Sequence, residues 1–259
     1  MTTDLSTASG NSTPFLVRMV AVHVAAIAVP FAIVLWLIGL SFWAVLVALV
    51  IAGGSTAWRM RDLDARLARR FGAVPVDPDA HPRLASVAES VAMAVGIPQP
   101  RLFVIDSAAG NAITWGAGDG PPSLAVTTGL LHRLDRVELE AVLAHQATMV
   151  NDRPVDVITL GAHLFGPLAG GPLAGIVASF IHTTTDPRSI VLADLEGARA
   201  TRYPPGMVAA LEALLDTDTL VPAVPRAFSN LCLVTPVHEP NPFALHPPLE
   251  DRIDLLREI

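Results

Sequence analysis

Two long apolar stretches near the start of the chain limit what this sequence can fold into. Residues 19–38 and 42–58 hold His23 as their one titratable side chain, and each is about long enough to cross a bilayer as a helix. The link between them, "GLS", is so short that they must form a hairpin. We therefore predict a transmembrane helical hairpin over residues 15–58, after a disordered Ser- and Thr-rich tail over residues 1–14.

The charges that flank the hairpin predict its orientation. Arg18 stands before it, and the Arg residues that follow it are Arg59, Arg61, Arg66, Arg69 and Arg70. Such a positive cluster stays on the cytoplasmic side, which predicts a multi-pass protein of the inner (plasma) membrane with its main domain cytoplasmic. The alternative is a cleaved signal peptide, but a soluble chain would follow that, whereas here a second apolar segment follows.

Composition excludes some partners. The chain has a net charge of −7 and no Lys, which argues against a nucleic-acid partner. Its one cysteine, Cys232, excludes an internal disulfide framework and is expected to be a small core residue. The high apolar content of 52% instead favours a membrane protein.

Residues 59–259 read as an α+β domain of mostly helices with a small sheet. Helical periodicity from Leu84 to Val95 predicts one helix, and Asp135 with Glu138 forms a capping-box pattern before a helix over residues 136–150. Strands are predicted at 101–106 and 123–129, with a loop or hairpin between them, and residues 229–236 are strand-like. Further helices are expected over residues 204–215 and at the C-terminal end.

A third apolar stretch, residues 155–182, is broken by "GPLAGGP". It could form one irregular spanning helix or two short helices that fold back at the break. We expect a bent, re-entrant or half-buried segment with its break at residues 170–172, because irregular backbone at membrane depth needs protein or water to satisfy it.

The segment "LEAVLAHQATMVNDRP" has the frame of a zinc-protease helix. In the motif H-E-x-x-H, two His four residues apart bind Zn²⁺ and the Glu activates a water. Here only His145 is present. Gln146 has no basicity near pH 7, and Met149 offers a thioether, which is a poor ligand for Zn²⁺.

Four motifs occur in order after the apolar hairpin: "PRLFVIDSAAGNAITWG", "LAVTTGLLHRLDRVELEAVLAHQ", "LADLEGA" and "HPPLEDRI". Together they resemble the HtpX-like membrane zinc metallopeptidases, the bacterial branch of the CAAX prenyl protease superfamily. The resemblance runs from about Phe15 to Ile259. It implies a zincin-like metallopeptidase domain, zinc as cofactor and a role in membrane-protein quality control.

The resemblance also implies roles for single residues. It places the first zinc ligand at His145, the catalytic Glu at Gln146, the second His ligand at Met149 and the Glu ligand at Ile190, so three of these four are replaced. The supporting residues are retained: Asp194 beside the first ligand, and His246 and Arg252 beside the bond to be cut.

Each of these residues also has a purely structural interpretation. His145 and Asp194 would form a buried hydrogen-bonded pair, and Met149 and Ile190 would fill the former metal cavity. His246 would cap or orient the "HPP" turn, and Arg252 would bridge helix ends or pair with a neighbouring acid. Asn111 could bind the backbone of a peptide in a groove, or simply form a turn. A rebuilt metal site would need other side chains, for which the sequence offers His132, His163, His182, Glu138 and Glu140.

We therefore expect a catalytically inactive membrane pseudopeptidase without a metal or small-molecule cofactor. It would act as a regulator, scaffold or substrate-holding partner of a membrane protein or complex. One way to hold such a partner is to take up a peptide strand at the sheet edge. One alternative is an active, divergent zinc-dependent endopeptidase of the membrane. The other is a structural subunit of a larger membrane assembly.

Overall fold

Helices and one small sheet make up the part of the chain that the computed structural model describes. These are residues 12–37, 39, 41–116, 120–151, 155–168, 175, 178–179, 188–236 and 245–259. Two compact units divide the chain, residues 1–65 and residues 66–259. The boundary lies a few residues beyond the predicted end of the hairpin at residue 58.

The first unit contains two apolar helices, α1 (Ser12–Leu37) and α2 (Ser41–Met60). They pack through small side chains, Ala28 of α1 against Ala48 and Ala52 of α2. α1 is long and apolar enough over Leu16–Leu37 to cross a membrane, while α2 provides a shorter apolar helix, Val45–Met60. A transmembrane hairpin therefore stays a prediction. α1 begins inside the predicted tail, whose residues 1–11 lie outside the described chain.

The second unit is built on a four-stranded mixed sheet of order β1-β2-β4-β3. The strands are β1 (Ala73–Pro75), β2 (Arg101–Ile105), β3 (Ala112–Trp115) and β4 (Ser123–Thr127). β1 and β2 are antiparallel, β2 and β4 parallel, and β3 and β4 antiparallel. Both predicted strands are confirmed. The segment between them contributes β3, so its hairpin alternative is the correct one, and β3 forms one edge of the sheet.

The helices of this unit largely follow the predicted pattern. They are α3 (Leu63–Arg70), α4 (Pro82–Val95), α5 (Thr128–Arg133), α6 (Arg136–Asn151), α7 (Val155–Phe165), α9 (Ser189–Thr201), α10 (Pro204–Leu215) and α11 (Leu249–Arg257), with the 3-10 turns η2 (Gly166–Leu168) and η3 (Arg226–Leu231). The capping box at the start of α6 is confirmed: Asp135 Oδ1 accepts from Glu138 N, and Glu138 Oε2 accepts from Asp135 N, both at 2.8 Å.

Two other predictions concern a strand over residues 229–236 and a break in the apolar stretch 155–182. The strand predicted over residues 229–236 is wrong, because η3 covers its first part and only Cys232 forms an isolated bridge, to Ile113 of β3. The apolar stretch 155–182 begins as the helix α7 and the turn η2. Its predicted break at residues 170–172 lies outside the described residues.

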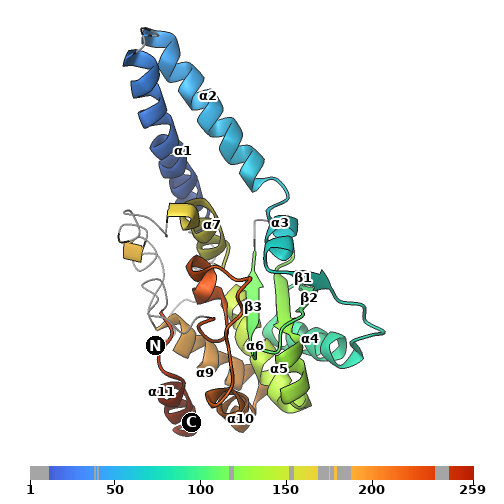
Figure 1. Ribbon diagram of the computed structural model, residues 1–259. Coiled ribbons are helices and arrows are strands. Elements are labelled where there is room, and N and C mark those ends of the chain that lie inside the picture. The colour runs from blue at the N-terminus through green and yellow to red at the C-terminus, as the bar shows by residue number, and fades with distance from the viewer. Residues whose placement is uncertain are drawn as a thin grey trace. The chain divides into compact units, whose positions relative to one another are not determined.

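The hydrophobic core of the second unit lies against one face of the sheet, where α4, α6, α9, α10 and α11 cluster (Figure 1). Ala112, Leu124 and Val126 supply the strand side of this core. The opposite face carries an aromatic group, in which Phe71 meets the rings of Trp115 and Phe228 edge to face, with centroids 5.4 and 5.3 Å apart. Both faces of β3 are thus covered.

α6 and α9 approach each other closely because of one glycine. A Cβ built on Gly197 of α9 would lie 2.8 Å from His145 N and 3.0 Å from His145 Cα. Thr148 Oγ1 of α6 also lies 3.3 Å from Ala193 O of α9, as a donor to that carbonyl. Backbone of α6 therefore lies directly against α9 at His145.

We expect Gly197→Ala to lower the free energy of unfolding by about 2 kcal/mol, because the added methyl group would push α6 and α9 apart. Gly120→Ala is the control, since no heavy atom lies within 4 Å of the Cβ position there. Denaturant unfolding of both variants measures the effect. Equal stability of the two variants would contradict the close packing of α9 on α6.

Candidate functional site

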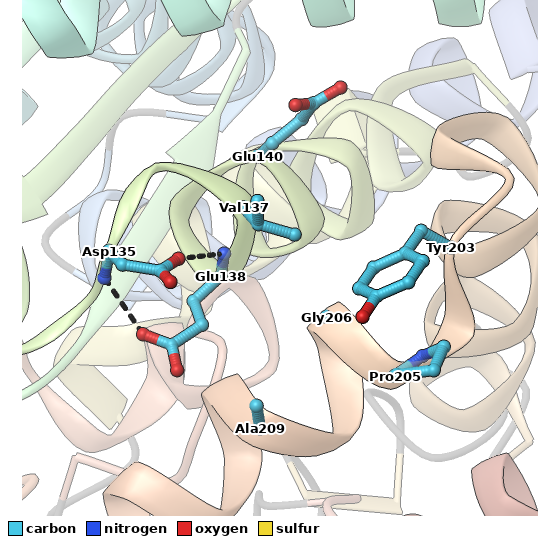
Figure 2. A pocket seen from close by; sticks show the side chains of 8 residues that line it. All are labelled: Asp135, Val137, Glu138, Glu140, Tyr203, Pro205, Gly206 and Ala209. Carbon is cyan, nitrogen blue, oxygen red and sulfur yellow. Dashed lines mark hydrogen bonds between the residues drawn. The ribbon is translucent and has the colours of Figure 1, made fainter.

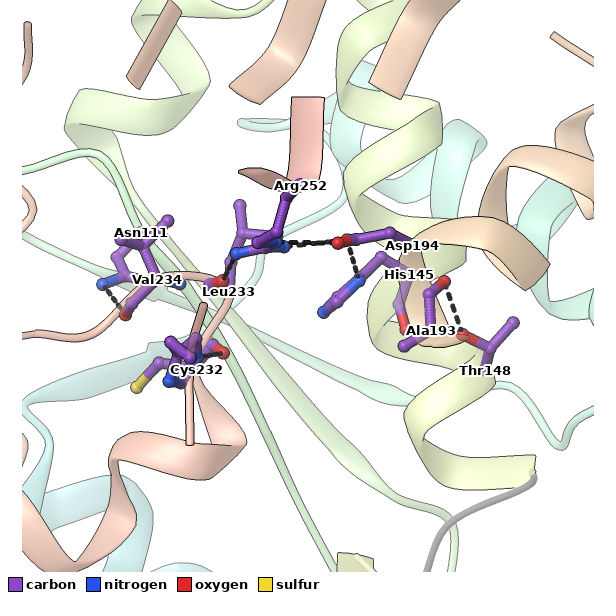
Figure 3. A network of polar contacts seen from close by, with 10 residues as sticks. Asn111, His145, Thr148, Ala193, Asp194, Cys232, Leu233, Val234 and Arg252 are labelled. Atoms are coloured by element: carbon purple, nitrogen blue, oxygen red, sulfur yellow. Dashed lines mark hydrogen bonds and ion pairs between the residues drawn. The ribbon is translucent and has the colours of Figure 1, made fainter. Parts of the chain in front are cut away.

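Three helices bring the predicted site residues together in the second unit (Figure 3). α6 carries His145, α9 carries Asp194 and α11 carries Arg252. Each of the three side chains is at most 1% exposed. Buried charged groups are stable only when they are paired and hydrogen-bonded, so their contacts define the site.

The carboxylate of Asp194 is the centre of these contacts. His145 Nδ1 lies 2.8 Å from Asp194 Oδ1. Arg252 binds the same carboxylate with both arms of its guanidinium group, Nε to Oδ2 at 2.7 Å and Nη2 to Oδ1 at 2.8 Å. The predicted pairs of His145 with Asp194 and of Arg252 with an acid are therefore present.

The charges around it keep Asp194 ionised. Burial alone would raise the pKa of this carboxyl, but the charge of Arg252, then that of His145, and the hydrogen bonds of both lower it to about 2. The carboxylate thus holds its negative charge at every physiological pH.

The remaining three positions of the expected zinc site are also buried. Gln146 and Ile190 are 0% exposed and Met149 is 1% exposed. Neither amide atom of Gln146 has a hydrogen-bond partner among the residues that the structure describes. These positions therefore offer an amide, a hydrocarbon and a thioether.

This set of side chains does not fit a zinc ion. Zinc sites in proteins use thiolate, imidazole and carboxylate ligands, usually three or four of them. Only His145 offers such a group here, and its Nδ1 already faces Asp194. In the described ranges, no group of three or more His, Cys, Asp or Glu side chains is placed to hold a metal ion. That the protein binds no metal stays a prediction.

Among the described residues, the side chains considered for a rebuilt metal site form no group that could hold a metal ion with His145. Glu138 is engaged in the capping box at the start of α6, and His132 is exposed on α5. His163 lies on α7, and His182 is outside the described residues. Glu138 and Glu140 instead line a separate pocket of about 440 Å³ between α6 and α10 (Figure 2). Tyr203, at the start of α10, lines the side of this pocket opposite to Glu138.

Asn111 is placed by the structure just before β3, where it is 2% exposed. Its Nδ2 donates to Val234 O at 2.9 Å and to Thr219 O at 3.1 Å. Its Oδ1 accepts from Val234 N at 3.3 Å. A peptide bound by Asn111 would have to replace these internal partners.

His246 lies shortly before α11 and contacts the same region. Its Nε2 is 2.9 Å from Cys232 O, and because a carbonyl only accepts, Nε2 is the nitrogen that carries the proton. Burial and then the charge of Arg252 lower the pKa of His246 to about 4. The ring is therefore neutral at pH 7. Burial also raises the pKa of the Cys232 thiol, in line with its expected place in the core.

Comparison with known proteins shows which family this chain is similar to. Residues 78–149 match peptidase family M48. A protease HtpX homolog of Acidiphilium cryptum (strain JF-5) is 30% identical over 251 residues, covering 83% of this chain and 86% of that protein. A protease HtpX homolog of Dictyoglomus thermophilum is 27% identical over 247 residues, covering 83% of this chain and 82% of that protein. A third, from Caldanaerobacter subterraneus subsp. tengcongensis, is 28% identical over 225 residues, 73% of this chain and 75% of its own length.

The chain belongs to the HtpX-like proteins of peptidase family M48. The suspected resemblance is thereby confirmed, and with it an M48 peptidase domain in a mostly helical chain with a small mixed sheet. The match includes His145, Gln146 and Met149, since it ends at residue 149. Ile190, Asp194, His246 and Arg252 lie beyond it, and their assignment rests on the motifs.

The sequence predicts the residues of the HtpX-like site but not all of their partners. Arg252 is expected to pair with an acid, but the sequence does not show that this acid is Asp194, 58 residues earlier. Asn111 contacts Val234 and Thr219, and His246 contacts Cys232. Of these partners, Cys232 and Val234 lie in the segment predicted as a strand. The β-rich sequence "LCLV" was a usable signal, because this segment does lie beside β3.

We expect Arg252→Met to destabilise the protein by about 3 to 5 kcal/mol at pH 7, because it leaves the Asp194 carboxylate buried without its main partner. The pKa of Asp194 is about 2 in the folded protein against 3.8 ordinarily. The stability that ionised Asp194 contributes is therefore complete above pH 3.8 and is lost as the pH falls through 2. In the variant, burial raises the pKa of Asp194 without the opposing charge of Arg252. The difference between parent and variant should therefore shrink as the pH falls from that raised pKa towards 2.

Urea unfolding of parent and variant between pH 2 and pH 7 measures this difference. The matched control on the same helix is Arg257→Met, whose partners Glu212 and Asp254 are exposed. It should change stability by less than about 1 kcal/mol. A pH-independent difference for Arg252→Met would show that its effect does not act through Asp194.

Proposed function

We propose that this HtpX-like protein is a pseudopeptidase: it keeps the family's domain, has lost its zinc chemistry, and works by holding or regulating a membrane-protein partner. The observation that carries the proposal is the side-chain set at the expected zinc site. Gln146, Met149 and Ile190 occupy buried positions where zinc hydrolysis would need a base and two ligands.

The chemistry of hydrolysis supports the proposal. A zinc peptidase needs a metal-bound water of lowered pKa and a general base to take its proton. The amide of Gln146 cannot accept that proton near pH 7. A single imidazole, His145, provides one ligand where three are usual.

Retention of the surrounding contacts supports a function that needs the fold without the reaction. Asp194 still binds His145 and Arg252 at 2.7 to 2.8 Å. Removing either Asp194 or Arg252 alone would leave a buried charge without its partner and would destabilise the domain. The pair therefore supports a function that needs the folded domain.

The membrane is the proposed location, and the cytoplasmic side the proposed place of the main domain. α1 is long and apolar enough to span a bilayer, and large apolar side chains of α1 and α2 are exposed, among them Trp36, Val50 and Trp58. Exposed apolar surface of this extent fits lipid or a membrane-protein partner. The partner would belong to a membrane complex or to membrane-protein quality control.

Two other functions compete with this proposal. A divergent active zinc endopeptidase would carry tightly bound zinc and cut unfolded membrane proteins. A structural subunit of a larger assembly would stay with one fixed partner through purification in mild detergent, whereas a regulator would exchange partners. Zinc content and co-purification therefore separate the three.

We expect the purified parent protein to carry no stoichiometric zinc and to leave casein uncut. The triple variant Gln146→Glu, Met149→His, Ile190→Glu should bind one zinc ion per chain, because it restores two His and one Glu on the facing helices α6 and α9. Without zinc it should be less stable than the parent, since polar groups enter an apolar core. Zinc should raise its melting temperature, because zinc binds only the folded state.

The matched control is the double variant Gln146→Glu, Ile190→Glu, which keeps Met149 and so lacks the second His. It should gain neither zinc nor zinc-dependent stability. Stoichiometric zinc in the parent together with cleavage that stops on chelation would establish the active peptidase instead. A folded triple variant without zinc uptake would mean that the three positions do not converge.

The orientation can be tested with single cysteines because the native Cys232 is buried. We expect a cysteine at Leu37→Cys, at the end of α1, to react in intact cells with a membrane-impermeant maleimide. A cysteine at Glu258→Cys should react only after lysis. The parent chain is the unlabelled control. Labelling of Glu258→Cys in intact cells would place the main domain outside and overturn the proposed orientation.

A further inference from the structure

The outer edge of β3 is occupied by a short segment of the same chain. An edge strand ordinarily leaves a row of N–H and C=O groups open to another strand. Here Leu233 N donates to Ala112 O at 2.8 Å, and Cys232 pairs with Ile113 in an antiparallel bridge. All four residues of β3 are buried. We call residues Cys232, Leu233, Val234 and Thr235 the strap.

Side chains hold the strap by its backbone (Figure 3). Each of its four successive carbonyls accepts a hydrogen bond from a different side chain. The pairs are His246 Nε2 with Cys232 O at 2.9 Å, Arg252 Nη1 with Leu233 O at 2.8 Å, Asn111 Nδ2 with Val234 O at 2.9 Å and Thr219 Oγ1 with Thr235 O at 3.3 Å. Asn111 Oδ1 also accepts from Val234 N, so its amide pairs with Val234 as a neighbouring strand would.

These backbone contacts do not depend on the strap's own side chains, but two of those side chains are buried. Leu233 is 0% exposed and belongs to the main hydrophobic core, Cys232 is 1% exposed, and Val234 is partly buried against that core. The arrangement therefore fits an extended backbone that brings a large apolar side chain to the place of Leu233 and a small one to the place of Cys232. Recognition through main-chain bonds with a single specificity pocket is how proteins add a peptide strand to a sheet edge.

We infer that the strap is a built-in occupant of a peptide-binding edge. An extended segment of a partner protein, with an apolar residue in the place of Leu233, binds beside β3 only when the strap leaves. This inference rests on the proposed partner-holding function and deepens it, because it names the contact surface and what closes it. The strap competes from within the chain, at a high effective concentration, so an unaltered protein holds partners weakly.

A disulfide can lock the strap in place. The bond from Leu233 N to Ala112 O flanks the Ile113–Cys232 pair, which makes that pair a non-hydrogen-bonded one with Cα atoms about 4.5 Å apart. This separation suits a disulfide. Since Cys232 is the chain's one cysteine, Ile113→Cys creates a single possible internal bridge. Oxidation of the folded full-length protein in detergent should form it, because positions 113 and 232 are directly opposite each other in the antiparallel bridge.

The strap can also be weakened without changing the edge that it covers. Leu233→Ala removes its largest buried side chain, and a peptide with the sequence of residues 229–236, with Ser in place of Cys232, restores that side chain in trans. We expect this fluorescently labelled peptide to bind Leu233→Ala at least tenfold more tightly than the parent in anisotropy titrations. In the double variant Ile113→Cys, Leu233→Ala, binding should persist in the reduced protein and fall at least tenfold after oxidation.

Matched controls isolate the strap from general loosening of the core. Leu211→Ala removes the same side chain from the same core at a residue of α10 that is also 0% exposed, and it should gain no peptide binding. A peptide with Ala in place of Leu233 should not distinguish Leu233→Ala from the parent. Circular dichroism confirms folding, and Leu233→Val replaces Leu233→Ala if the latter unfolds.

Three results would overturn the inference: peptide binding unaffected by the disulfide, no gain of binding in folded Leu233→Ala or Leu233→Val, or a bridge that fails to form in the folded protein. None of these measurements depends on zinc or on cleavage. Failure of the inference about the strap and failure of the pseudopeptidase proposal are therefore distinguishable. The first would appear in the anisotropy titrations, and the second would appear in the zinc content of the parent protein.

Discussion

The negative charge of Asp194 is the constraint on which the second unit depends. An ionised carboxylate that is 1% exposed must be neutralised inside the protein. His145 and Arg252 do this from two other helices, so one carboxylate fixes α6, α9 and α11 relative to each other. Arg252 then extends the network to the strap through Leu233 O. The close approach of α6 and α9 at Gly197 leaves little room for any other arrangement.

Because Asp194 is held by Arg252, the side chains at the expected zinc-site positions can differ while the contacts around them are kept. Asp194 is tied to the fold through Arg252, whatever the residues at positions 146, 149 and 190 are. Replacing Asp194 would leave Arg252 as a buried cation without a partner, at a large loss of stability. Apolar side chains at Met149 and Ile190 carry no such penalty in a dry core. Under the proposed function, the residues at positions 146, 149 and 190 can differ from zinc-site residues because the pair of Asp194 and Arg252 does not depend on them.

How far the sequence predicts this structure varies with the kind of interaction. The start of α6 followed from local chemistry, since Asp135 and Glu138 close a capping box within one turn. The pairing of His145 with Asp194 followed from the family resemblance, because it joins helices distant in the chain. The segment that contains the strap was predicted as a strand, but the side-chain contacts that hold it could not be foreseen. These contacts are made to backbone carbonyls, which are identical in every residue, and one bridge joins the segment to β3.

The bond between Arg252 and Asp194 also sets an order of events during synthesis. A chain is made from its N-terminal end, and its early parts begin to fold first. Asp194 leaves the ribosome 58 residues before the cation that neutralises it. Until α11 has been made, closing α9 onto α6 would bury this carboxylate without its main partner. Assembly of the core must therefore wait for α11, so a chain cut short before Arg252 remains open and recognisable as unfinished.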